Sequence, residues 1–244
     1  MKKKSNEIGM NRTGNASSPV DSKKMLENVD PNVSTAPRIE KSRISAVRTA
    51  YSENAAPVGS VPPPASVKGA ITTGAQMLTG KNPAVFINKL GERLAFERTG
   101  TRLYQAVISR YDVLKATPGF PKLADLKKIH GDELAHFQML WDSLVELGAD
   151  PTVVTPGADL AGVESTGLLQ VITDPRTRGA ECLHSLLVAE LADHDGWEML
   201  IDLARSLGHD TLAGRFEKAL QQEEMHLSSV RNWMTTIINN EAAA

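Results

Sequence analysis

The chain has 244 residues, of which 41% are hydrophobic and 23% are charged, and its formal net charge is −2. This composition suits one soluble domain with room to spare, and the small net charge favours no particular partner, so we expect no nucleic-acid partner. The sequence contains no apolar run of about eighteen residues, so it predicts no membrane span. No apolar stretch follows its N-terminal lysines, so we predict no signal peptide and expect a cytoplasmic location. Cys182 is the single cysteine, which excludes an internal disulfide and a Cys-x-x-Cys metal ribbon.

Residues 1–80 differ in composition from the rest of the chain. They hold 11 Lys/Arg against 6 Asp/Glu, whereas residues 81–244 hold 16 against 23. They also carry 7 of the 13 prolines, and Tyr51 is their one aromatic residue. Such a segment buries too little apolar surface to offset its ordering entropy, so we predict a disordered basic tail. The tail could be a solvated linker or an arm that docks on an acidic partner, and charge alone does not decide between them.

From residue 81 onward the sequence has the punctuation of a helical protein. Proline stands at the expected first helical position in three places, and Gly208 precedes a fourth start at His209-Asp210-Thr211. We predict helices over residues 83–115, 121–148, 176–207 and 210–238. Two short loops give two antiparallel hairpins, and residues 148–174 connect one hairpin to the other. The predicted domain over residues 81–244 is therefore an all-α four-helix bundle with one long crossover connection.

The inward face of each predicted helix is apolar except near its middle. Steps of three or four residues keep side chains on one face of a helix. On that face the first and third helices each place one glutamate, and the second and fourth each place a Glu-x-x-His pair. The six residues are Glu97, Glu133, His136, Glu190, Glu223 and His226.

The six residues are also expected to lie at one height in the bundle. Residues at one height in an antiparallel hairpin are equally far from its loop. The midpoint between Glu97 and the Glu133/His136 pair falls near residue 116, and that between Glu190 and the Glu223/His226 pair falls near residue 207. Both midpoints lie at predicted loops, so the six side chains should converge on a single layer.

Four carboxylates in a bundle interior require a compensating charge. Without one they would protonate or unfold the bundle. Two divalent cations balance four ionised glutamates when both histidines are neutral. Oxygen-rich ligation with one imidazole per ion suits iron or manganese better than zinc. We therefore predict two Fe ions as cofactors, with two Mn ions as the alternative.

The pattern Glu97, Glu133-Leu-Ala-His136, Glu190, Glu223-Glu-Met-His226 resembles the di-metal carboxylate site of the ferritin-like superfamily. The resemblance covers about residues 83–238. The stretch LGERLAFERTGTRLY is similar to bacterial ferritin-like domain proteins, and rubrerythrins and manganese catalases are the nearest groups whose chemistry it suggests. The rubredoxin-type module of a typical rubrerythrin would need further cysteines, which this sequence lacks.

The resemblance also implies residues that orient the two histidines from the facing helix. In the family an acidic residue often precedes the Glu of Glu-x-x-His and contacts the histidine of the partner helix. Here Asp132 would contact His226, and Gln222 would contact His136. Independently, Tyr104 lies two turns from Glu97 on the same face. It could be a redox tyrosine, or a core residue whose hydroxyl is hydrogen-bonded.

Other ionisable residues lie off the inward face. Glu181 and His184 repeat the Glu-x-x-His spacing, but at 100° per residue they point away from Glu190. Asp193, one turn after Glu190, and Glu224, beside Glu223, are candidates for an extra ligand, but both are about 60° to 100° from the face by the same count, and we predict neither as a ligand.

Three classes of function agree with this sequence. The first is an oxidoreductase whose di-iron or di-manganese centre reacts with O₂ or H₂O₂. The second is an iron-handling protein that oxidises and sequesters Fe(II), for instance as a homo-oligomer. The third is a bundle with a structural metal. Whether the chain is an enzyme is left open, with a peroxidase, oxidase or ferroxidase as the enzyme classes expected.

Overall fold

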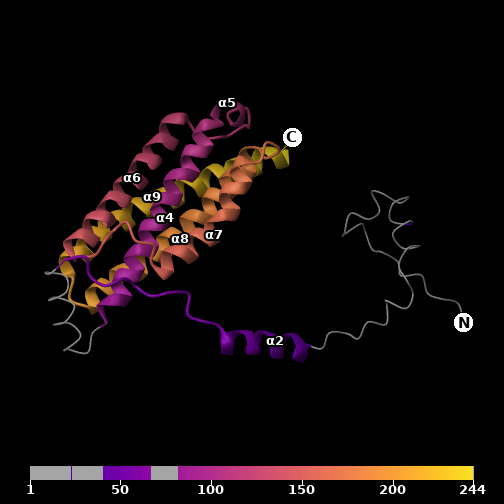
Figure 1. Ribbon diagram of the computed structural model, residues 1–244. Coiled ribbons are helices and arrows are strands. Elements are labelled where there is room, and N and C mark those ends of the chain that lie inside the picture. The colour runs from indigo at the N-terminus through magenta and orange to yellow at the C-terminus, as the bar shows by residue number, and fades with distance from the viewer. Residues whose placement is uncertain (1–22, 24–40, 67–81, 244) are drawn as a thin grey trace, which may run out of the picture. The chain divides into compact units, whose positions relative to one another are not determined.

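The computed structural model describes residues 23, 41–66 and 82–243, and the regular elements in these ranges are all helices (Figure 1). The all-α class is thereby confirmed. The chain divides into two compact units, Met1–Ala56 and Pro57–Ala244. None of the helices in the described ranges is long and apolar enough to cross a membrane.

The first unit contains helix α2, Lys41–Asn54, inside the segment predicted to be disordered. The rest of the predicted tail in this unit lies almost entirely outside the described residues. The stretch KSRISAVRTAYSEN contains neither proline nor glycine, the two residues that disfavour a helix most. The average composition of residues 1–80 did not indicate this local helical segment. Residues 44–53 are all exposed, including Val47 and Tyr51.

In the second unit, helices α4 (Pro83–Ser109) and α6 (Leu123–Glu146) pack along each other. The side chain of Asn82 accepts a hydrogen bond from Ala84 N at 3.2 Å, and Pro83 occupies the first turn as predicted. The predicted end at residue 115 is too late for one continuous helix. A non-helical residue, Arg110, separates α4 from the short helix α5, Tyr111–Leu114.

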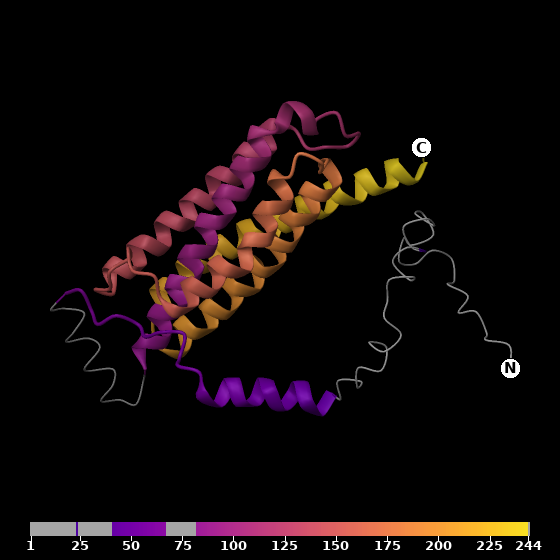
Figure 2. The ribbon, with the colours of Figure 1, turned by 45° about the vertical axis from the view of Figure 1, so that its right-hand side comes forward.

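The connection between the two hairpins contains a helix that the sequence prediction missed. Helix α7, Pro156–Thr173, is capped by the preceding residue Thr155, whose hydroxyl accepts from Ala158 N at 3.3 Å. It packs against α4 and against α8, Gly179–Ser206, and Figure 2 shows it running beside them. A Cβ at Gly91 would lie 2.4 Å from Thr155 Oγ1, so glycine allows the close approach of α7 to α4.

Helix α9, Asp210–Ala243, packs along α8 after a tight turn in which Gly208 has φ 83°. The N-terminus of α8 lies three residues later than predicted. Residues before it form a turn, in which Asp174 Oδ1 accepts from Arg176 N at 2.9 Å and Arg110 donates to Thr177 O at 2.8 Å. Pro175 belongs to this turn and not to the helix.

Two apolar clusters fill the interior of the helical unit. One includes Phe86, Leu140 and Trp197, and the other includes Leu103, Leu126 and Leu186. Each combines residues of α4, α6 and α8, and α9 contributes to both. The polar residues Glu97, Glu133, Glu190 and Glu223 fall between the residues of these two clusters along their helices, so apolar layers close the interior on both sides of them.

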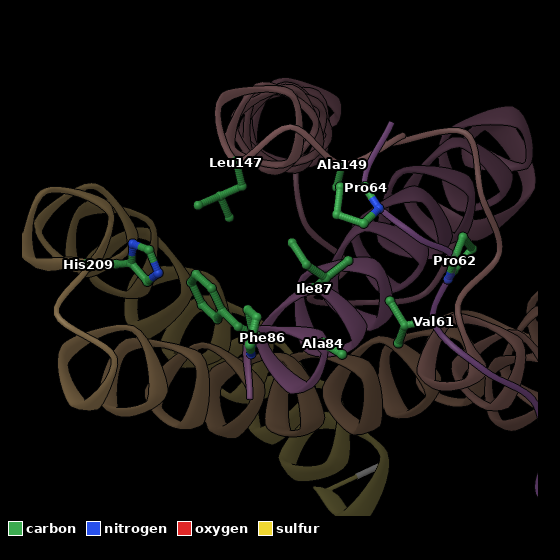
Figure 3. Close-up of a pocket in the computed structure, with 10 residues that line it drawn as sticks. Val61, Pro62, Pro64, Ala84, Phe86, Ile87, Leu147, Ala149 and His209 are labelled. Carbon is green, nitrogen blue, oxygen red and sulfur yellow. The ribbon is translucent and has the colours of Figure 1, made fainter. Parts of the chain in front are cut away.

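Residues 57–66 also belong to the helical unit. The boundary between the two compact units lies at Ala56–Pro57, whereas the sequence analysis placed the end of the tail at residue 80. The amide of Ala65 donates to Gly148 O at 2.9 Å. Half-buried Val61, Pro62 and Pro64 line an apolar pocket of about 70 Å³ at one end of α4, together with Phe86, Ile87, Leu147, Ala149 and His209 (Figure 3). Proline-rich composition indicated disorder, but prolines also lose little entropy when they pack on a surface.

Two truncations separate the contributions of these segments to stability. Deleting residues 1–56 should leave the thermal midpoint nearly unchanged, because the contacts of Pro57–Ala244 remain. Deleting residues 1–66 should lower the free energy of unfolding by roughly 1–2 kcal/mol, because apolar burial is lost. Each kcal/mol should lower the thermal midpoint by about 2–4 °C. Thermal melts of both variants measure this, and equal midpoints would contradict the role of residues 57–66.

Candidate metal centre

The six predicted ligands lie in one buried layer contributed by four helices. Each of them is at most 3% exposed. Helix α4 supplies Glu97 and α8 supplies Glu190, whereas α6 and α9 each supply a Glu-x-x-His pair one turn apart. Apolar residues before and after each ligand lie on the same helix face. Because that face is buried, the ionisable side chains on it are buried as well.

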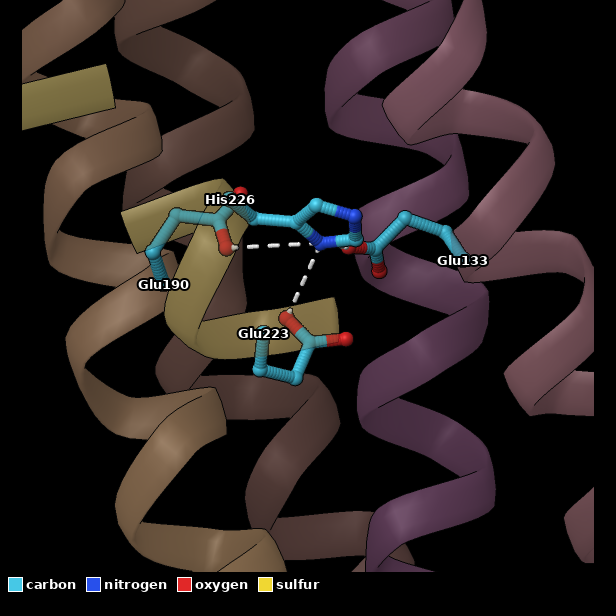
Figure 4. A group of neighbouring side chains, drawn as sticks. All are labelled: Glu133, Glu190, Glu223 and His226. Carbon is cyan, nitrogen blue, oxygen red and sulfur yellow. Dashed lines mark hydrogen bonds and ion pairs between the residues drawn. The ribbon is translucent and has the colours of Figure 1, made fainter. Parts of the chain in front are cut away.

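The first group of possible ligands consists of Glu133, Glu190, Glu223 and His226. Their donor atoms all lie within 4.8 Å of one another. The Nδ1 atom of His226 lies 3.2 Å from Glu223 Oε2, 3.6 Å from Glu133 Oε1 and 4.0 Å from Glu190 Oε2. Figure 4 shows these side chains converging from α6, α8 and α9, with the imidazole directed toward the carboxylates. This group could hold a metal ion.

The second group consists of Glu97, His136 and Glu223, again within 4.8 Å of one another. The Nδ1 atom of His136 lies 2.7 Å from Glu223 Oε1 and 3.7 Å from Glu97 Oε2. Glu223 thus directs one oxygen toward each histidine and belongs to both groups. Two adjacent positions that share a carboxylate are the arrangement that a two-metal carboxylate site requires.

Contacts on the outer side of each imidazole fix which nitrogen faces the interior. His226 Nε2 lies 3.1 Å from Asp132 Oδ2, and His136 Nε2 lies 3.0 Å from Gln222 Oε1. The structure therefore contains both contacts that the resemblance implied for Asp132 and Gln222. Asp132 in turn accepts a hydrogen bond from Lys128. With Nε2 occupied, Nδ1 of each ring is left to face the carboxylates.

Two inward-facing carboxylate oxygens of this layer, Glu97 Oε2 and Glu190 Oε2, have no hydrogen-bond partner within the described part of the chain. The imidazole nitrogens that face them lie 3.7 Å and 4.0 Å away. Buried polar atoms are nearly always hydrogen-bonded, so two such atoms at one centre call for an explanation. Carboxylate oxygens and imidazole nitrogens are the donors that a divalent transition metal accepts, and the residues present fit such an ion.

The protein without metal keeps protons in this layer. Burial, together with the charges of Glu97 and Glu223, raises the pKa of Glu133 to about 8. Burial and the neighbouring carboxylates also raise the pKa of Glu190 well above its ordinary value. Burial alone would lower the pKa of the histidines, but their hydrogen bonds to glutamates raise it to about 10 for His136 and about 11 for His226. Burial opposes ionisation of Glu223 too, yet both histidines lower its pKa to about 2.

Tyr104 is buried beside this layer, and its hydroxyl donates a hydrogen bond to Glu190 Oε1. Burial, followed by the charge of Glu190, raises the pKa of the phenol well above 10.0. The tyrosine therefore has a hydrogen-bonded hydroxyl. It also lines a small cavity of about 10 Å³ that reaches Glu133, Glu190 and Asp193.

This layer contains two further charged residues, of which the sequence prediction missed Arg93 and placed Asp193 off the inward face. Arg93 is 4% exposed, and its Nη2 lies 3.0 Å from Glu97 Oε1. It also forms an ion pair with Asp193, which is 3% exposed. Asp193 was expected about 60° to 100° off the inward face, but it is buried, and its carboxylate lies within 4.8 Å of those of Glu97, Glu133 and Glu223. The available signal for Arg93 was its position four residues before Glu97, which places both on one helix face.

The remaining candidates lie outside the layer. Glu181 and His184 are exposed, and Glu181 accepts from Arg178 N at 2.7 Å at the start of α8. Glu224 is exposed as well, as predicted. A further group on the outer surface of α8, which is formed by His194, Asp195 and Glu198, has two exposed members.

Gly100 provides the space that one carboxylate occupies. A Cβ at this position would lie 2.0 Å from Glu133 Oε2, so Gly100→Ala should displace Glu133 and lower metal affinity by about 10-fold or more. Gly131 on the neighbouring helix has open space around it, so Gly131→Ala should raise stability by about 0.5–1 kcal/mol and leave metal affinity unchanged. Metal titration and melts of both variants test this, and equal affinities would contradict it.

Comparison of the chain with protein-family models finds no match, and comparisons with curated proteins and with solved structures find none either. The interpretation of the buried layer therefore depends on its own geometry and chemistry.

Proposed function

We propose that this chain is a di-metal carboxylate protein of the ferritin-like type, in which α4, α6, α8 and α9 form the four-helix bundle and α7 lies on its outside as part of the crossover. The observation that carries the proposal is the pair of adjacent ligand groups that share Glu223 in a layer closed by apolar clusters. If these side chains were ordinary hydrogen-bonded core residues, the unpartnered oxygens Glu97 Oε2 and Glu190 Oε2 would have no explanation.

The ligands divide naturally between two ions. Glu97 and His136 would hold one ion and Glu190 and His226 would hold the other, and Glu133 and Glu223 are close enough to members of both pairs to contribute to either ion. Two divalent ions then balance four ionised glutamates with neutral histidines. Iron is the ion that we propose, with manganese as the alternative, because both accept this oxygen-rich donor set.

We propose O₂ or H₂O₂ as the substrate and oxidation–reduction as the chemistry. The metals supply the redox chemistry when they are bound. The cavity beside Glu133, Glu190 and Tyr104, at about 10 Å³, is close to the space that a single water molecule needs. This size favours a diatomic or similarly small substrate over a large organic one. Asp132 and Gln222 hold the imidazoles, and the surrounding apolar clusters exclude bulk water.

Metal content and turnover test the proposal together. Metal-free protein loaded with Fe(II) in the absence of oxygen should retain about two ions per chain after desalting, as the charge balance requires. The loaded protein should then consume O₂ or H₂O₂ over many cycles when a reductant is supplied. Absence of bound metal would overturn the proposal.

Loading without repeated turnover would favour the iron-handling alternative. In that case each chain would oxidise its bound Fe(II) once and then take up more. Binding without any oxidation would leave only the structural-metal alternative. The same oxygen-electrode and metal-analysis experiment distinguishes the three outcomes.

A further inference from the structure

Arg93 and Asp193 form a buried ion pair against the candidate metal centre. Both side chains are almost fully buried. The same Nη2 atom that contacts Asp193 Oδ1 lies 3.0 Å from Glu97 Oε1. The guanidinium therefore bridges one proposed metal ligand on α4 and one carboxylate on α8 that the ligand assignment does not use. Arginine remains charged in proteins, so it brings a permanent positive charge to this layer.

The neighbouring residues hold the guanidinium in this place. A Cβ at position 196 would lie 2.3 Å from Arg93 Nη1, so Gly196 on α8 leaves room for it. The Cζ atom of Arg93 lies 4.6 Å from the centroid of the Phe96 ring and 5.7 Å from that of Trp197. Glycine within a helix costs up to about 1 kcal/mol, and here it accommodates a charged side chain beside the site.

Asp193 is a fifth carboxylate in the layer. One of its oxygens lies within 4.8 Å of carboxylate oxygens of Glu97, Glu133 and Glu223. Apart from the ion pair with Arg93, neither of its oxygens has a hydrogen-bond partner in the described part of the chain. Five carboxylates with two divalent ions would leave one excess negative charge. The positive charge of Arg93 cancels this excess. The remaining net charge of the layer is then the four negative charges that two divalent ions neutralise.

We propose that the Arg93–Asp193 pair sets the net charge of the metal centre and thereby its preference between oxidation states, with both members acting as positioning residues that do not bind the metals. This inference rests on the proposed function, because it requires a two-metal site. Asp193→Asn would leave Arg93 as an excess positive charge, which disfavours the more highly charged Fe(III). Arg93→Gln would leave Asp193 as an excess negative charge, which favours Fe(III).

Opposite effects of the two substitutions and their cancellation in the double variant are the expected result. In iron-loaded protein, Asp193→Asn should raise the reduction potential and Arg93→Gln should lower it. Each should change the Fe(III)/Fe(II) ratio at fixed potential by about tenfold, or about 59 mV for one electron. The double variant should lie within about threefold of wild type. Metal-free Asp193→Asn protein titrated with Mn(II) should bind about 10–100-fold more weakly, and the double variant should recover.

Two exposed residues on the same helices provide matched controls. Arg102→Gln and Asp195→Asn make the same changes in net charge at the surface, where solvent screens them, and should leave potential and affinity unchanged. Shifts of both buried single variants in one direction, with no recovery in the double variant, would mean that the pair acts only in packing and would overturn the inference. Wild-type protein that binds no Mn(II) or iron would overturn the proposed function along with it.

Discussion

Replacing His226 by alanine is expected to lower metal affinity by about 10–100-fold or more, and to abolish most O₂ or H₂O₂ consumption. The imidazole offers Nδ1 to the group formed by Glu133, Glu190 and Glu223. No other histidine contributes to that group, so the variant leaves only carboxylates there. Isothermal titration with Mn(II) and metal analysis after loading with Fe(II) measure the effect.

His184 supplies a matched control on a neighbouring helix. It has the same Glu-x-x-His spacing, from Glu181, but both residues are exposed on α8. His184→Ala should leave metal affinity and activity unchanged. If His184→Ala removed metal binding and His226→Ala did not, the assignment of ligands on α8 and α9 would be wrong.

The positions of the six proposed ligands could be predicted from sequence because each depends on local periodicity. A helix face repeats every three or four residues, so Glu97 could be placed relative to Leu90 and Leu94 without knowledge of the partner helices. The hairpin midpoints then gave the relative height of the four helices. Both steps use only spacing along the chain, which the structure preserves.

The burial of Asp193 could not be predicted in the same way, because it depends on which helices surround α8. The sequence prediction assumed one narrow inward face for each helix. Helix α8 packs against α9, α4 and also α7. Its buried face is therefore broader than that of a bundle helix without such an additional neighbour, and it includes both Glu190 and Asp193. Helix α7 itself was missed because glycines at residues 157, 162 and 167 weaken its helical signal.

The segment before α4 illustrates a related limit. Proline content and charge, averaged over residues 1–80, led to the prediction of disorder for the whole segment. Packing of Val61, Pro62 and Pro64 against α4 depends on the apolar surface left at the end of that helix, including Phe86 and Ile87. Composition carries no information about such a surface, which exists only after the helices have assembled.

Metal-free protein is expected to lose stability as the pH rises, and metal binding is expected to reverse this loss. The raised pKa of Glu133, about 8, means that its folded form keeps a proton that the unfolded chain gives up above about pH 4.5. The raised pKa of His226, about 11, acts in the same direction above about pH 6.5. Because the folded state binds more protons in both cases, the free energy of unfolding falls with pH. Thermal melts of chelator-treated protein at pH 6 and pH 9 should show a lower midpoint at pH 9.

Metal ligation requires carboxylates and neutral imidazoles, so binding at pH 7 should release the protons that these groups hold. Four proposed ligands have a pKa raised in the folded protein, namely Glu133, Glu190, His136 and His226, which gives a release of about four protons per chain. Titration with Mn(II) in buffers of different ionisation enthalpy measures this number. Glu190→Gln should release one proton fewer, since the amide has none to lose, and its metal-free form should lose less stability between pH 6 and pH 9. If wild-type protein bound metal with no release of protons, these four groups would not be the ligands.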